Sequence, residues 1–139
     1  LFINPIFKYF TYIDMNWDYL KKNNLSKKIN RKPEIDLAYQ NEKKNYNGNY
    51  EKYLLDIYLN NRLYNLQLNK FPYDLEKNIV HCVLWLNPII QKSFIHNKKF
   101  IYTILKKYIP NKPFLFHMNL PKNRSINTIP HYQVFIKMN

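Results

Sequence analysis

The sequence contains very little glycine and cysteine. Its 139 residues include one glycine, Gly48, and one cysteine, Cys82. A single glycine excludes the glycine-rich loops that cradle phosphates and the Gly-x-Ser-x-Gly elbow of many hydrolases. Left-handed turns must therefore be made mostly by asparagine, which tolerates a positive φ better than other non-glycine residues. A single cysteine excludes an internal disulfide and any cysteine-based metal site.

Acidic side chains are also scarce. The chain has 22 Lys+Arg against 9 Asp+Glu, a formal net charge of +13. Such an excess is typical of proteins that contact a polyanion. The basic residues include only three arginines, Arg31, Arg62 and Arg124, although arginine is the better bidentate ligand of phosphate and guanine. The surplus of Lys, Asn, Ile, Tyr and Phe resembles the composition of a very AT-rich genome. The charge therefore predicts loose or structural polyanion contact rather than base-specific recognition.

No apolar run approaches the roughly 20 residues that span a bilayer. The most apolar stretch lies at the start, where Asn4, Pro5 and Lys8 interrupt it. We interpret residues 1–15 as an N-terminal apolar extension and residues 16–139 as a single domain. An intracellular location is favoured, in the cytoplasm or in an organelle.

The clearest element is a strand over residues 79–86, a nearly continuous apolar run bounded by Asn78 and Asn87. Such a run is typical of a strand covered on both faces. Alternation places Val80, Cys82, Leu84 and Leu86 on one face, and Ile79, His81, Val83 and Trp85 on the other. The first face is purely apolar, whereas the second includes a histidine.

The remaining elements complete an α+β domain. Apolar periodicity and capping residues predict helices over residues 5–13, 17–22, 25–29, 33–46, 50–61 and 89–108. Two further strands are predicted over residues 114–118 and 132–138. The expected fold is a set of N-terminal helices plus a small sheet of about three strands, with one further helix packed on it. That helix carries a basic outer side formed by Lys98, Lys99, Lys106 and Lys107. These lysines belong either to a solvated face or to a polyanion-binding stripe.

A candidate ligand pocket follows from the predicted strands. His81, His131 and Gln133 converge if the strands over residues 79–86 and 132–138 are neighbours. Glu76 and Arg124 would then lie at the rim. The full candidate set adds two residues of the preceding polar loop: Glu76, His81, Asn119, Arg124, Ser125, His131 and Gln133. Such a group suits an anionic or sugar-like ligand, because arginine holds charge and histidine exchanges protons near neutral pH.

A structural interpretation competes with this pocket. A histidine among apolar strand residues is more often hydrogen-bonded to the backbone than catalytic. Arg31 and Arg62 are expected to pair with acidic neighbours or to cap helix ends. No metal site is predicted, because the sequence has no His-Glu-x-x-His motif and no cysteine pair. No cofactor can be assigned.

Two motifs nevertheless resemble those of a known family. The pattern FPYxLExxIxHxVxW of residues 71–85 resembles the signature of the domain-of-unknown-function family that includes the fungal N-acetylglucosamine-induced protein. That family's pattern continues with an asparagine and an RSIxxxxHxHV stretch, which corresponds here to Asn119, Arg124, Ser125, Ile126, His131, Gln133 and Val134. The resemblance spans residues 16–138 and implies no established reaction or cofactor.

Two positions depart from the family pattern. Asn78 stands where relatives usually have glycine, which predicts a turn with positive φ. Gln133 stands where relatives have a second histidine. Glutamine forms hydrogen bonds but does not shuttle protons, so a catalytic pair of histidines would be incomplete in this chain.

Three functions are compatible with these patterns. The first is a non-catalytic binding or structural module that contacts a polyanion or a ribonucleoprotein assembly, an organellar ribosome being one setting. The second is a small enzyme or ligand-binding domain with its pocket around His81, Arg124 and His131. The third is a protein–protein module in which residues 1–13 pack on a partner. Charge and the presence of Gln133 favour the first.

Overall fold

A computed structural model describes residues 17–22 and 30–138 of the chain. Its helices are α2 (Trp17–Lys22), α3 (Pro33–Lys44), α4 (Tyr50–Leu59), α5 (Lys92–Ile95) and α6 (Lys98–Tyr108), with a 3-10 turn at Pro121–Asn123. Its strands are β1 (Tyr64–Leu68), β2 (Ile79–Leu86), β3 (Phe114–His117) and β4 (His131–Lys137). The N-terminal extension, the partner-binding segment and the helices predicted at 5–13 and 25–29 lie outside the described residues.

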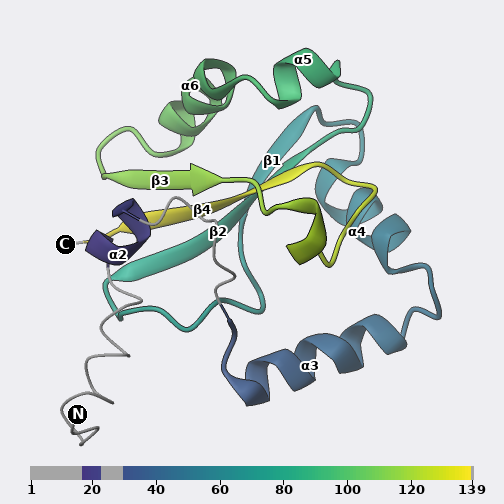
Figure 1. The fold of residues 1–139 in the computed structure, drawn as a ribbon. Coiled ribbons are helices and arrows are strands. Elements are labelled where there is room, and N and C mark those ends of the chain that lie inside the picture. Colours follow the sequence, from purple (N-terminus) through teal and green to yellow (C-terminus); the bar gives the residue numbers. More distant parts are fainter. Residues whose placement is uncertain (1–16, 23–29, 139) are drawn as a thin grey trace, which may run out of the picture.

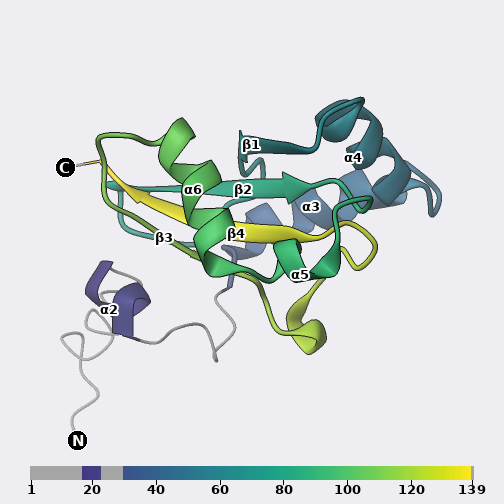
Figure 2. The same ribbon diagram turned by 90° about the horizontal axis from the view of Figure 1, so that it is seen from above.

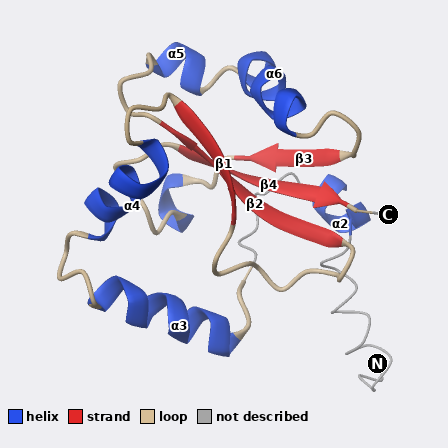
Figure 3. Cartoon of the chain, turned by 180° about the vertical axis from the view of Figure 1, so that it is seen from behind, coloured by secondary structure: helices blue, strands red, loops and turns tan. Residues whose placement is uncertain are grey.

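The four strands form one antiparallel sheet in the order β1-β2-β4-β3. Helices α5 and α6 lie on one side of this sheet, and α3 and α4 lie on the other (Figure 1). The view from above shows α5 and α6 running across the sheet (Figure 2), and the view from behind shows the same three layers (Figure 3). Mixed helix and strand in a single domain matches the predicted α+β class.

The face beneath α5 and α6 is an apolar core. Leu84 and Val134 come from the sheet, and Ile101 and Leu105 come from α6; all four are 0% exposed. The alternation of β2 and β4 thus places residues as predicted, with the purely apolar face fully covered. This packing fixes α6 on the sheet and leaves its opposite side exposed.

The other face combines apolar packing with polar side chains. Tyr39 of α3 and Leu54 of α4 pack against Val83 and Trp85 of β2. Near the far end of the sheet, Leu20 of α2 joins Ile79 and Phe135 in a smaller cluster. The buried polar residues of the described chain also lie on this face: Asn65, His81, His117, His131 and Gln133.

The predicted three-stranded sheet was one strand short. The missing strand is β1, which pairs with β2 from Tyr64↔Leu86 to Leu68↔Cys82. It is a five-residue edge strand in which Asn65 and Gln67 alternate with apolar residues. Its side chains do alternate with period two, but the run is short and directly follows α4, so its pattern is weak.

The prediction of one helix over residues 89–108 was also wrong. Residues 87–91 form a loop, and the chain breaks again between α5 and α6. Asn97 causes the second break, because its side-chain oxygen accepts a hydrogen bond from Phe100 N at 3.1 Å and so begins a new helix. Apolar periodicity continues across this cap and does not reveal it.

Asparagine makes the left-handed turns, as predicted. In the described chain the residues with positive φ are Asn47 (50°), Asn61 (58°) and Gly48 (86°). Asn61 ends α4 two residues earlier than predicted, since an α-helix cannot continue through that conformation. The expectation for Asn78 was wrong, because its φ is not positive.

Candidate functional site

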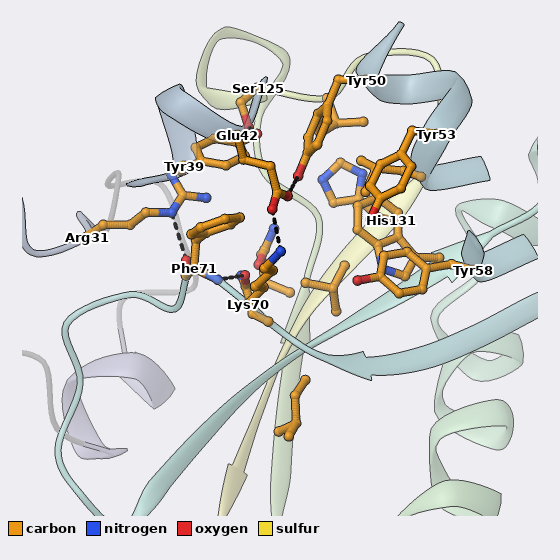
Figure 4. Close-up of a pocket in the computed structure, with 17 residues that line it drawn as sticks. Arg31, Tyr39, Glu42, Tyr50, Tyr53, Tyr58, Lys70, Phe71, Ser125 and His131 are labelled. Atoms are coloured by element: carbon orange, nitrogen blue, oxygen red, sulfur yellow. Dashed lines mark hydrogen bonds and ion pairs between the residues drawn. The ribbon is translucent and has the colours of Figure 1, made fainter. Parts of the chain in front are cut away.

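The polar face of the sheet carries a cleft. Two adjoining cavities, of about 90 Å³ and about 460 Å³, share five lining residues: Arg31, Tyr39, Ser125, His131 and Gln133. We call these residues the cleft set. They come from the segment before α3, from α3 itself, from the loop over residues 118–130 and from β4. Figure 4 shows the narrow part of the cleft, with tyrosines of α3 and α4 around it.

His81 supports the cleft from behind. The backbone N–H of Tyr73 donates to its Nδ1 at 3.1 Å, so the ring proton must be on Nε2. Nε2–H then donates to Gln133 Oε1 at 2.6 Å. The ring is packed between Tyr73 and Phe135, with centroids 4.4 and 5.0 Å away. Burial lowers the pKa of His81 to about 3, so this histidine stays neutral. Its two hydrogen bonds hold the Tyr73 backbone and the Gln133 side chain in place.

Gln133 is oriented by His81. Because its Oε1 accepts from the histidine, its amide nitrogen points elsewhere, and no protein group accepts from that nitrogen. The atom is not sealed from solvent either, because His117 Nδ1 is the one sealed and unpartnered side-chain nitrogen in the described chain. Gln133 therefore presents an N–H₂ donor to the cleft that it lines.

His131 presents the opposite kind of group. Its Nδ1 lies 2.8 Å from the carbonyl oxygen of Ile129, which can only accept, so Nδ1 carries the proton. Nε2 is left with a lone pair and has no protein partner. The ring stacks on Trp85 with centroids 5.0 Å apart. Burial lowers the pKa of His131, which keeps the acceptor nitrogen unprotonated at neutral pH.

Arg31 supplies the positive charge of the cleft. Its Nε donates to the carbonyl oxygen of Phe71 at 2.8 Å, and its guanidinium lies over the Tyr39 ring at 4.3 Å. The carboxylate that pairs with it, Asp36, is 3.7 Å away and is 51% exposed. An exposed partner at this distance neutralises little charge.

Hydroxyl groups and a neutralised ion pair complete the walls. Tyr39 and Ser125 share a hydrogen bond of 2.8 Å between their hydroxyls. At the narrow end, Glu42 pairs with Lys70 and accepts a hydrogen bond from Tyr50 at 2.8 Å. Both carboxylate oxygens of Glu42 thus have a protein partner. Burial raises the pKa of the Tyr50 hydroxyl.

The predicted site residues lie in four different places. Ser125, His131 and Gln133 belong to the cleft set. Asn119 lines the wide cavity, where it donates to Tyr73 Oη at 3.0 Å. His81 lies behind the cleft wall, and Glu76 is exposed on the loop before β2. Arg124 lines a third cavity, which shares Asn119 and His131 with the wide one, and it donates to the carbonyl oxygen of Asn119.

Sequence reasoning missed two members of the cleft set. Arg31 was expected to pair with an acidic neighbour, which it does weakly, but it also lines the cleft. Tyr39 was not singled out, because it is one of 13 tyrosines. Both residues lie within the 16–138 span of the family resemblance, but neither belongs to its two motifs.

The predicted lysines lie on the far side of the molecule. Lys98, Lys99, Lys106 and Lys107 are exposed on α6, across the sheet from the cleft. In the part of the chain that the structure describes, no group of three His, Cys, Asp or Glu could hold a metal ion. No helix in those same residues has the length and apolar character to cross a membrane. Cys82 is a free, buried thiol.

Comparisons with known proteins confirm membership of a domain-of-unknown-function family, but not the link to the fungal N-acetylglucosamine-induced protein. The crystal structure of HTC1 has a similar fold, with a TM-score of 0.64 and 20% sequence identity over 89% of this chain and 85% of that chain. At this identity the likeness shows the fold alone. No curated protein matches. The model of the family described as Protein of unknown function (DUF3605) matches residues 5–137. The chain therefore belongs to the DUF3605 family.

Proposed function

We propose that this protein is a non-catalytic module that binds RNA through the exposed side of α6, within a ribonucleoprotein assembly. The observation that carries the proposal is the separation of charge along the chain. All nine acidic residues lie at or before Glu76. Residues 77–139 contain nine lysines, one arginine and no acidic residue, and so carry +10 of the net +13. A uniform compositional bias would enrich lysine throughout but would not remove every carboxylate from one half.

The α6 lysines form no ion pair among the described residues. The ion pairs among the described residues involve Arg31, Lys32, Lys52 and Lys70, all before β2. None of the four α6 lysines has a carboxylate three or four residues away, so the helix gains no ion-pair stabilisation from them. Their uncompensated field favours a polyanionic partner.

An aromatic side chain lies within this basic surface. Tyr102 is 49% exposed and falls one turn from Lys98 and one turn from Lys106. Lysines that hold phosphates on either side of an exposed ring match the way single-stranded nucleic acids are bound, with bases stacked on aromatic side chains. An organellar ribosome is one assembly of this kind. The resemblance to the fungal N-acetylglucosamine-induced protein stays a prediction, and no ligand is inferred from it.

The test replaces Lys98, Lys99, Lys106 and Lys107 by glutamine and measures binding to a single-stranded RNA at several salt concentrations. The wild-type protein should be retained on RNA at about 150 mM salt and released steeply above it. The variant should bind at least about tenfold more weakly. Its slope of log affinity against log salt should be shallower by about 3, because each single-stranded phosphate contact contributes about 0.7.

The matched control removes the same charge elsewhere, by replacing Lys21, Lys22, Lys44 and Lys52 with glutamine. It should keep most of the affinity and the slope. Equal losses in the two variants would show binding by net charge alone. A wild-type protein that does not bind RNA even at about 50 mM salt would exclude the proposal.

A further inference from the structure

The cleft on the opposite face is built for a different kind of ligand. Its five shared residues line two adjoining cavities: a narrow one between α4 and the sheet, which Figure 4 shows, and a wide one that also reaches Asp36 and Asn119. We propose that this cleft binds a small organic anion that carries a hydroxyl group. Arg31 and Gln133 would hold the oxyanion, and His131 would accept the hydroxyl proton in a hydrogen bond.

The charge on the cleft walls selects an anion. Arg31 has two terminal nitrogens and only one weak carboxylate partner, Asp36, and its side chain is 18% exposed. Glu42 is the other acidic side chain that lines the cleft, and Lys70 and Tyr50 already occupy its oxygens. A half-buried guanidinium whose terminal N–H groups have only one weak partner is a preferred partner of carboxylates and phosphates.

The donors and the acceptor of the cleft are fixed before any ligand arrives. The Tyr73 backbone sets the His81 tautomer, His81 sets the Gln133 amide, and the amide N–H₂ is left for the ligand. Separately, the Ile129 carbonyl sets the His131 tautomer and leaves Nε2 as an acceptor. An unprotonated ring nitrogen accepts a hydrogen bond from a ligand hydroxyl group. An oxyanion has no O–H proton to donate, so the ligand needs a hydroxyl group as well. Preorganised groups of this kind lower the ordering cost of binding.

The hydroxyl pair of Tyr39 and Ser125 adds adaptable contacts. Their mutual hydrogen bond leaves one hydroxyl proton and further lone pairs for a ligand in the wide part of the cleft. A cavity volume of about 460 Å³ there suits a molecule of a few carbon atoms rather than a polymer.

Calorimetry with defined probes tests the inference. The probes are glycerol 3-phosphate and D-glycerate as hydroxylated anions, glycerol as the neutral analogue, and propionate as the anion without a hydroxyl. At least one hydroxylated anion should bind with a Kd of about 1 mM or tighter. Glycerol and propionate should bind at least about tenfold more weakly than that anion. The affinities of glycerol 3-phosphate and D-glycerate, compared with each other, show whether the cleft prefers a phosphate or a carboxylate.

Three variants assign the contacts. Arg31→Gln should weaken anion binding at least about tenfold, whereas Arg62→Gln, which removes an exposed arginine outside the cleft, should not. Ser125 is an exposed residue, and Ser125→Ala removes the hydroxyl that pairs with Tyr39, so binding should weaken about threefold or more. His131→Phe keeps a ring against Trp85 and should remove the preference for hydroxylated over plain anions.

Several results would overturn the inference. The first is the absence of saturable binding of either hydroxylated anion up to about 10 mM. The second is glycerol binding as tightly as the hydroxylated anions. The third is an equal loss of anion affinity in Arg31→Gln and Arg62→Gln. The α6 variant without its four lysines should bind the small anions normally. The RNA proposal and the cleft proposal can therefore fail independently.

Discussion

At the scale of single residues, the polar face of the sheet depends on histidines that stay neutral. Burial lowers the pKa of His81 to about 3 and that of His117 to about 4, and it also lowers the pKa of His131. Each ring donates a hydrogen bond through a defined nitrogen: His81 to Gln133, His131 to the carbonyl oxygen of Ile129, and His117 to Asn119 Oδ1 at 2.9 Å. Protonation would put uncompensated charge among these aromatic side chains.

The stability of the protein should therefore fall as the pH is lowered below about 6.5, the pKa of an unfolded-chain histidine. Below that pH the unfolded chain binds protons that the folded rings refuse, because their folded pKa values lie at about 3 and 4. The stabilisation is complete above pH 6.5 and is lost toward the folded pKa values. Between about pH 6 and 5, His81 and His117 should each contribute a slope of roughly 1 kcal/mol per pH unit, and His131 should add to the loss in the same direction.

Urea unfolding at pH 7, 6 and 5 measures this dependence. The His96→Gln variant removes an exposed histidine and should leave the curve unchanged. A free energy of unfolding that stays constant from pH 7 to pH 5 would show that these rings are protonated equally well in both states.

At the scale of secondary-structure elements, the strands show what the sequence can and cannot predict. β2 was predicted at its observed bounds because its seven apolar residues, interrupted only by His81, form a run of strand length that is bounded by Asn78 and Asn87. Alternation then placed His131 and Gln133 on one face of β4, beside His81. It could not place Arg31 there, since nothing local links a residue before α3 to a strand at the other end of the sequence. The edge strand β1 and the break between α5 and α6 depend on pairing and capping rather than on periodicity.

The Asn97 cap provides a test at this scale. Asn97→Ala removes the side-chain acceptor of Phe100 N and should lower the free energy of unfolding by about 1 kcal/mol. Asn97→Ser retains a side-chain acceptor, so its free energy of unfolding should fall by only about 0.3 kcal/mol. Thermal or urea unfolding of the three proteins checks the order. Equal stabilities of the alanine and serine variants would show that the α6 start does not depend on this bond.

At the scale of the whole molecule, the sheet separates two chemically different sides. α6 presents lysines without carboxylates, whereas α3 and α4 enclose a cleft with a few fixed polar groups. Under the two proposals above, one side binds an extended polyanion and the other binds a small anion. Both preferences follow from the positive field of a chain with a net charge of +13.

This charge should also make stability depend on salt. With no partner bound, the lysines after β2 repel one another, and added salt screens that repulsion. The melting temperature should rise by a few degrees, roughly 2–5 °C, between about 20 mM and 300 mM NaCl. The variant with four α6 glutamines should show a smaller rise and a higher melting temperature at low salt. A wild-type melting temperature that does not change with the NaCl concentration would mean that the lysines are too far apart to repel one another.

The position of β4 has a consequence for how the protein is made. β4 follows every other strand in the sequence, yet it lies between β2 and β3 and pairs with both. During synthesis from the N-terminus, β2 has no central partner until residues 131–137 have left the ribosome. The same seven residues carry His131 and Gln133. A nascent chain thus joins the β1-β2 pair to β3 through β4 in one late step, and under the cleft proposal anion binding requires that step.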